Sequence, residues 1–471
     1  NKDNWTKINL DYEDNSKRNI ISDSLNLNSH KHKSYGAISG FGEMENVFIE
    51  IGYNHIINDS VVEGIIQKVN TSNNFSVNTQ LINDTNTRLS IYGNYRILNK
   101  TNGVRKEKFL NSRINYFKKS SNDIIKINIL YETNSGNLAQ QEYTFIEVEP
   151  GVGNYKWIDI NENNIQELEE FEIAQFEDEG IYLRVLLPNQ KFIKTYQNKF
   201  SQSLNINFKK WAKDKLKFKK ILSHFQNQTQ YLIQKQSAQE NNQFDLNPFK
   251  ISSKNLLGLT MNLRNSLFFN KGKQYYSTTY NFTNNRSKNS LSFGNIENDL
   301  LSHQLTFKHK LNSILFSSAV TFENKNSKSE NFESKNYTFN EVKYGPKLSY
   351  FIQDNNKIDI YYQYSNKENL ISNFETLTQN KFGISSAFSN KNKLAINGEL
   401  NYYKNKFKGN PNSIIGYIMM EGLQSGNNLT WTLSIQKKVT KSVDLNLNYF
   451  ARKSDNNSAI HNGSVQLKAN F

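Results

Sequence analysis

Cysteine is missing from the 471 residues of this chain, which excludes a disulfide framework and any metal site built on thiolates. Proline is scarce, at five residues. No apolar run approaches the roughly 18 residues that a transmembrane helix needs. A His-Glu-x-x-His zinc motif, a glycine-rich phosphate loop and a nucleophile elbow are also missing. We therefore predict no catalytic residue and expect a protein that is not an enzyme.

The composition is polar and yet strand-forming. Mean hydropathy is −0.72 and hydrophobic residues make up 36% of the chain. Disordered chains are poor in aromatic residues, whereas this chain contains 31 Phe and 25 Tyr, which favour strands. A transmembrane β-barrel reconciles the two properties, because only its outward face must be apolar while its lumen and loops are polar.

Charge is unevenly distributed along the chain. The net charge is +15, but residues 142–179 hold twelve acids and one base, Lys156. The rest of the chain is therefore strongly basic. No recognition helix or aromatic RNA-binding motif accompanies the basic residues, so nucleic acid is not a predicted partner. Anionic headgroups of outer-membrane lipid and lipopolysaccharide are the expected partners of a basic barrel.

Apolar residues recur at every second position in several segments. The clearest sets are Ile358, Ile360, Tyr362 and Tyr364; Leu394, Ile396, Leu400 and Tyr402; Leu429, Trp431, Leu433 and Ile435; and Val443, Leu445, Leu447, Tyr449 and Ala451. Successive side chains of a strand point to opposite faces, so each segment has one apolar and one polar face. Their length, about ten residues or more, suits a tilted bilayer crossing. Strands of a soluble β-sandwich, the alternative, average about five or six residues.

Short polar turns, one of them at residues 212–215, alternate with longer loops, as in outer-membrane barrels. Twelve strands fit between residue 215 and the C-terminus if one strand, or two around a bend, takes up residues 414–437. We predict an all-β fold, a large antiparallel transmembrane barrel of about 18–22 strands. Residues 1–70 would hold N-terminal strands, 71–133 barrel strands, 134–190 an acidic extracellular excursion, and 191–471 barrel strands to the end.

The last strand resembles a membrane-insertion signal. Val465, Leu467, Ala469 and Phe471 share one face of an alternating segment that ends on an aromatic residue. Outer-membrane barrels present such a strand to their insertion machinery, which is therefore an expected partner. With the C-terminus in the periplasm, the strand count places the acidic excursion outside the cell.

The closing segment of the chain and two stretches of the acidic excursion resemble large outer-membrane proteins of Bacteroidota. The closing segment contains Glu-Gly-Leu-Gln-Ser-Gly at residues 421–426, Ala-Arg-Lys at 451–453 and Ile-His-Asn-Gly at 460–463. Residues 147–159 and 170–176 are similar to the same group. Ser425, Ala451 and Asn462 depart from the usual Pro, Gly and Thr. The resemblance implies a barrel fold and an outer-membrane location. Because members are usually much longer, it also implies a C-terminal portion of a longer protein.

The acidic excursion contains one site-like pattern. Asp159, Asn161, Asn163, Glu167 and Glu170 occupy positions 1, 3, 5, 9 and 12 of a twelve-residue loop, the spacing of calcium-binding loops. Asn164 stands where glycine is usual, and it can adopt the left-handed conformation. We therefore predict a Ca²⁺ site here. The alternative is a solvated acidic loop.

Residues 141–149 and 181–187 flank this loop as candidate strands of an extracellular hairpin, which would either dock a partner or cover the pore. Three functions follow. The first is a non-enzymatic barrel subunit of an envelope complex, serving as a scaffold for surface lipoproteins or other barrel proteins, or in protein export or outer-membrane assembly. The second is a porin or transporter, and the third, favoured by no motif, is an outer-membrane hydrolase.

Overall fold

The computed structural model contains no bound ligand, and its described residues cover nearly the whole chain. They are 4–43, 46–101, 103, 106–120, 122–239, 243–251, 255–273, 275–291, 294–353, 356–371, 374–390, 393–440, 442–455 and 457–469, with the main chain alone at 139–141, 189–191 and 291.

Strands dominate the described residues. They are β1 (Asn4–Asn15), β2 (His30–Gly42), β3 (Phe48–Val62), β4 (Ile65–Asn83), β5 (Thr87–Lys100), β6 (Glu107–Lys119), β7 (Ile125–Glu147), β8 (Tyr155–Trp157), β9 (Phe171–Ile173), β10 (Tyr182–Asn207), β11 (Phe225–Ala238), β12 (Leu256–Phe269), β13 (Tyr276–Leu291), β14 (Gly294–Leu311), β15 (Ile314–Ser329), β16 (Tyr337–Gln353), β17 (Asn356–Asn369), β18 (Thr376–Asn390), β19 (Leu394–Lys408), β20 (Gly426–Lys438), β21 (Val443–Ser454) and β22 (Ile460–Ala469). All except β8 and β9 have ten residues or more. The predicted all-β class and strand length are confirmed.

Short helices connect some of these strands. They are η1 (Leu168–Glu170), η2 (Glu177–Glu179), η3 (Phe208–Lys213), α1 (Lys217–Leu222), η4 (Glu333–Lys335) and α2 (Ile414–Met420). Among the described residues, no helix has the length and apolar character to cross a membrane.

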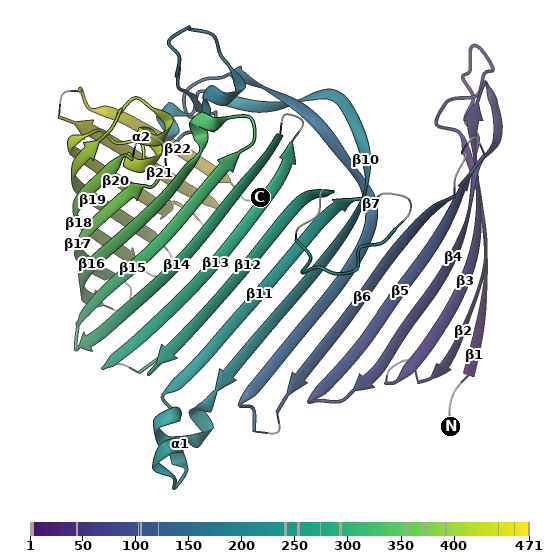
Figure 1. Ribbon diagram of the computed structural model, residues 1–471, viewed down its shortest axis with the longest axis horizontal. Helices are drawn as coiled ribbons and strands as arrows, with labels where there is room; N and C mark the ends of the chain where they lie inside the picture. The colour runs from purple at the N-terminus through teal and green to yellow at the C-terminus, as the bar shows by residue number, and fades with distance from the viewer. Residues whose placement is uncertain are drawn as a thin grey trace. The chain divides into compact units, whose positions relative to one another are not determined.

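The chain divides into two units, which are described separately. One comprises Asn1–Ala139, Phe192–Lys210 and Gln228–Asn262, and the other Gln140–Lys191, Trp211–Asn227 and Leu263–Phe471. In the first, β1 to β7 pair antiparallel in chain order. In the second, β13 to β22 do the same, as Figure 1 shows. The predicted large antiparallel sheet is confirmed. Pairing of β22 with β1 is not among the strand pairs of the described residues.

Alternation gives the strands of the second unit two different faces. On β16 and β17 the side chains of Leu348, Tyr350 and Ile360 are 45%, 51% and 57% exposed. The intervening positions carry polar side chains such as Glu341 and Asp359, which are buried by partners on the same face. In the described part of the second unit, the sheet therefore has an exposed apolar face and a polar face with internal contacts, as the period of two predicts.

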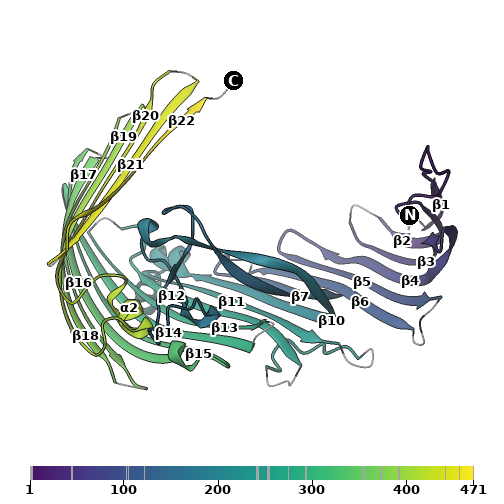
Figure 2. The same cartoon turned by 90° about the horizontal axis from the view of Figure 1, so that it is seen from above.

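The prediction of a strand throughout residues 414–437 is wrong in its first half, where α2 forms. The hydroxyl of Ser413 accepts a hydrogen bond from the amide of Gly416 and so caps the helix. At its end Glu421 and Gly422 have φ values of 56° and 74°, which stop a helix. Figure 2 shows α2 on the concave side of the neighbouring strands. Its residues are apolar around the whole circumference, so no alternation distinguishes helix from strand.

The sequence predicts a short turn at residues 212–215. β10 and β11 do connect there, but the connection is longer than predicted and contains η3 and α1. Twelve strands, β11 to β22, nevertheless follow residue 215 in the described part of the chain, as predicted. The strands predicted to flank the acidic loop are extensions of β7 and β10, which pair with each other. The small strands β8 and β9 pair near the tip of this extension.

The C-terminal strand forms as β22, antiparallel to β21. Val465 and Leu467 lie on one face and are 68% and 69% exposed. Ala469 is the last residue of this strand. Phe471, the aromatic end of the predicted insertion signal, lies outside the described residues.

Candidate functional site

An apolar cluster holds α2 against the polar face of the sheet. Phe339 and Leu377 from β16 and β18 pack with Ile415, Met419 and Met420 from the helix, and none of the five is more than 5% exposed. The strand members sit at positions where the alternation otherwise places polar residues. The cluster therefore fixes the C-terminal end of α2 beside charged side chains of neighbouring strands.

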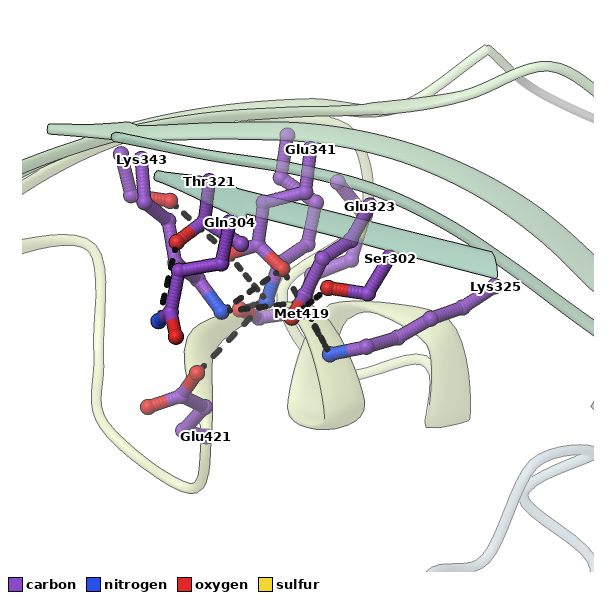
Figure 3. A network of polar contacts seen from close by, with 11 residues as sticks. Ser302, Gln304, Thr321, Glu323, Lys325, Glu341, Lys343, Met419 and Glu421 are labelled. Carbon is purple, nitrogen blue, oxygen red and sulfur yellow. Dashed lines mark hydrogen bonds and ion pairs between the residues drawn. The ribbon is translucent and has the colours of Figure 1, made fainter. Parts of the chain in front are cut away.

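One buried carboxylate next to α2 is shared by three lysines. Glu341 is 2% exposed, and its oxygens lie 3.2 Å from the ammonium of Lys343 and 3.6 Å from those of Lys325 and Lys367. Lys367 also donates to the carbonyl of Met419 at 3.1 Å, which ties the network to the helix. Figure 3 labels Met419 together with Glu341, Lys325 and Lys343. Because an unpaired buried charge is costly, the three lysines offset the desolvation of Glu341.

A second charged cluster continues along the same face. Asp359 lies 2.9 Å from both Lys347 and Lys357. The hydroxyl of Tyr361 lies 2.6 Å from a carboxylate oxygen of Glu399, to which it donates. Across β15 to β19 the residues that form such pairs are six lysines and four acids: Lys325, Lys343, Lys347, Lys357, Lys367 and Lys381 with Glu323, Glu341, Asp359 and Glu399. This strip of the polar face is therefore paired but carries an excess of positive charge.

The acidic segment, residues 142–179, folds back onto the end of β21. The guanidinium of Arg452 lies 2.7 Å from Asp178 and 3.0 Å from Glu179, and it stacks over the ring of Phe176 at 4.2 Å. The ring of Phe176 also stacks on Phe450 at a centroid distance of 5.5 Å. These contacts join residues more than 270 positions apart. The segment is thus not a free-standing arm.

Tyr417 of α2 forms the other half of this contact. Its hydroxyl donates to Glu179 at 2.6 Å and accepts from the amide of Gln175 at 2.9 Å. Burial, followed by the bond to Glu179, raises the pKa of the Tyr417 hydroxyl well above its usual range. Lys156 pairs with Glu179 at 3.0 Å. The phenol is therefore neutral at physiological pH and serves as a hydrogen-bond donor.

The five predicted calcium ligands lie in one turn but bond mainly to the turn itself. The Glu170 carboxylate accepts from the indole of Trp157 at 2.7 Å and from the amide of Ile160 at 3.0 Å. Asp159 accepts from the amide of Asn164, which has a φ of 59° as predicted for a tight turn. Asn161 donates to Glu167 at 3.2 Å, and Asn163 accepts from the amide of Ile165.

Most of the hydrogen bonds of these five side chains are therefore made within the loop. Among the described residues, no group of three or more His, Cys, Asp or Glu side chains is close enough together to hold a metal. One oxygen of Asp159 is buried without a hydrogen-bond partner. As arranged here, the residues fit a hydrogen-bonded loop better than an ion cage, because Glu170, the expected bidentate ligand, uses both oxygens for protein donors.

A pocket of about 650 Å³ lies between the acidic segment, α2 and the ends of the last strands. Trp157, Asp159, Tyr417, Leu423 and Arg452 are among the residues that line it. Two of the three groups of residues that resemble Bacteroidota proteins, residues 147–159 and the closing segment, thus meet at this pocket, and Phe176 of the third group contacts Arg452 beside it. Sequence reasoning missed the meeting because nothing in the spacing of Arg452 indicates a partner near residue 178.

No family model and no curated protein sequence matches this chain. Among solved structures it is similar to the siderophore receptor PirA from Pseudomonas aeruginosa, at 9% identity and a TM-score of 0.40, over 100% of this chain and 73% of that one. The ferric-catecholate import receptor Fiu from E. coli, in its open form, gives 9% and 0.35 over 94% and 72%. OccK11 (OpdR) of Pseudomonas aeruginosa gives 8% and 0.34 over 93% and 95%. At these values the likeness carries no functional argument.

Proposed function

We propose that this chain is a β-barrel of the bacterial outer membrane, in Bacteroidota, and that solutes pass through its lumen. The observation that carries the proposal is the pair of unlike faces on the long strands. Exposed residues such as Leu348, Ile360 and Phe382, the last 54% exposed, form an apolar surface too large for a soluble monomer. Facing lipid, these side chains need no protein partner.

The polar face is then the wall of the lumen. A barrel of about twenty strands is too wide for its own side chains to fill, so its interior holds water or a plug. The lysines that pair with Glu341 and Asp359 supply a charged lining. Closure of the sheet through β22 and β1 is part of this proposal, since it removes the two open edges that lipid cannot satisfy.

Transport is favoured over the scaffold role that the sequence first suggested. The scaffold prediction rested on the long acidic loop, the implied longer parent chain and the lack of catalytic motifs. The first of these grounds is weakened, because Arg452 and Tyr417 hold the acidic segment on its own chain. A segment bound in this way suits a cover over the lumen. Hydroxyls in the described charge networks, such as Ser365 on Glu341, meet carboxylates that are already paired with lysine, and no catalytic motif accompanies them, so a hydrolase is not proposed.

Planar-bilayer recording of the purified protein tests the proposal. We expect discrete conductance steps, and Lys325→Gln should shift the reversal potential toward cation preference because it removes a positive charge from the wall. Lys343 remains in that variant to pair with Glu341. The matched control is Lys453→Gln. Lys453 is exposed on the face of β21 opposite to the polar face, so it does not line the proposed lumen. A protein without conductance that purifies with stoichiometric lipoproteins would support the scaffold instead.

A further inference from the structure

The connection between β10 and β11 is unlike the other turns because it is basic and apolar together. Between Trp211 and Leu222 five of the twelve residues are lysine and one, Asp214, is acidic. Figure 1 labels α1, the helix in this connection. Phe218 and Ile221 are three positions apart and so lie on the same side of the helix. They are 68% and 61% exposed, and Leu216 just before them is 60% exposed.

The connection is built to keep this shape. Asp214 accepts a hydrogen bond from the amide of Leu216 at 3.1 Å, and its carboxylate pairs with Lys219 at 2.8 Å. Both bonds hold the pKa of the Asp214 carboxyl below its usual range. The only acid of the connection is thereby neutralised. Lys213, Lys215, Lys217 and Lys220 then have no acidic partner among the described residues and lie around exposed apolar side chains.

This connection and the acidic segment lie at opposite ends of β10. β10 begins next to that segment at Tyr182 and ends at Asn207, immediately before η3. A membrane-spanning strand has its two ends at opposite surfaces of the bilayer. If the acidic segment is extracellular, the basic connection is at the periplasmic surface, where the leaflet consists of phospholipid.

We propose that residues 211–222 bind anionic phospholipid headgroups of the periplasmic leaflet, an inference that rests on the proposed barrel function. Lysines around exposed Phe, Leu and Ile are the composition of segments that lie at a membrane interface, with ammonium groups at the phosphates and apolar side chains at the acyl boundary. Long lysine side chains reach the headgroups while their methylene stems cover apolar surface. Charge complementarity selects phosphatidylglycerol or cardiolipin over a zwitterionic lipid.

The absence of native cysteine allows a single-site test. Ile221→Cys carries an environment-sensitive fluorophore, and the whole protein is placed in nanodiscs of phosphatidylcholine alone or mixed with phosphatidylglycerol, with brominated acyl chains as quencher. We expect strong quenching only with phosphatidylglycerol, and its loss on raising salt from 0.05 to about 0.5 M, because salt screens exposed charges. Lys215, Lys217 and Lys220 changed together to Gln should abolish the quenching; Lys219 stays to pair with Asp214.

Leu467→Cys, labelled in the same way, reports on the barrel itself, because Leu467 lies on the apolar face of β22. Quenching at position 467 with none at 221 in either lipid would overturn the lipid-binding inference and leave the barrel standing. Equal quenching at 221 in both lipids would overturn the recognition of anionic headgroups. If position 467 is not quenched either, the proposed membrane function fails and the inference with it.

Discussion

Tyr361 of β17 lies directly opposite Gly383 of β18, and its ring covers the glycine. A Cβ atom at Gly383 would stand 2.2 Å from that ring, well inside van der Waals contact. Trp5 and Gly40 form the same kind of pair between β1 and β2. Aromatic side chains that cover a facing glycine help to fix strand register. At these positions the glycine provides space for the ring.

Gly383→Ala is therefore expected to destabilise the sheet by about 1–3 kcal/mol, the usual cost of overpacking. The Tyr361 ring cannot move away without breaking its hydrogen bonds to Glu399 and Asn401. Urea unfolding in lipid vesicles, followed by tryptophan fluorescence, measures the change. Gly93→Ala is the control, because nothing lies within 4 Å of a Cβ there. Equal effects of the two variants would contradict the explanation.

Arg452 holds the acidic segment through two ion pairs. Its side chain is 14% exposed and pairs with Asp178 and Glu179. Arg452→Gln removes the cation paired with Asp178 and one of the two cations paired with Glu179. Because these carboxylates are largely buried, we expect the docking of the segment to weaken by roughly 3 kcal/mol. Limited proteolysis should then cut residues 142–179 faster. Lys453→Gln, one position along the strand and exposed, should leave the cleavage rate unchanged.

Alkaline pH is expected to release the same contact through Tyr417. Burial and the bond to Glu179 raise the pKa of its hydroxyl in the folded state. The stabilisation is thus fully present below the ordinary tyrosine pKa of about 10, and it is lost as the pH rises through the folded value. Hydrogen exchange of the acidic segment should increase above about pH 10. In Tyr417→Phe this dependence should be missing, and an unchanged profile would rule out the phenol as its cause.

At the scale of elements, alternation predicted the long strands because each has one apolar and one polar face. It failed at α2, whose residues are apolar on all sides. It also failed for the path of the acidic segment. Phe176, Asp178 and Glu179 are ordinary acidic-loop residues in sequence, and only the fold brings them to Arg452. Contacts between residues so far apart in the chain produce no periodic pattern in the local sequence.

The calcium loop remains a prediction that concerns one element. Calcium binding requires the Glu170 carboxylate to leave the indole of Trp157 and turn toward Asp159. If the sequence prediction holds despite these bonds, isothermal titration with CaCl₂ gives one site per chain, and residues 159–170 are cut more slowly by protease. Glu170→Gln should abolish both effects. Absence of binding heat at millimolar calcium would show that these acids serve only to close the turn.

At the scale of the whole molecule, the acidic segment and the basic remainder of the chain are complementary. Residues 142–179 hold twelve acids, and their partners Lys335 and Arg452 bind them to a connection and a strand end of the second unit. Lys156 pairs with Glu179 inside the segment. In the proposed barrel, a segment of this length that is fixed at several points would narrow access to the lumen. Its many ion pairs also make its position sensitive to salt.

Replacing residues 149–180 by a short Gly-Ser linker should therefore increase single-channel conductance severalfold. The cut points lie beyond the paired part of β7 and before β10 begins at Tyr182, so the strands keep their partners. Arg452→Gln should move in the same direction by a smaller amount, because it loosens the segment without removing it. High salt should reduce the difference between wild type and Arg452→Gln. If the deletion leaves conductance unchanged while the protein still inserts, the segment does not cover the conducting path.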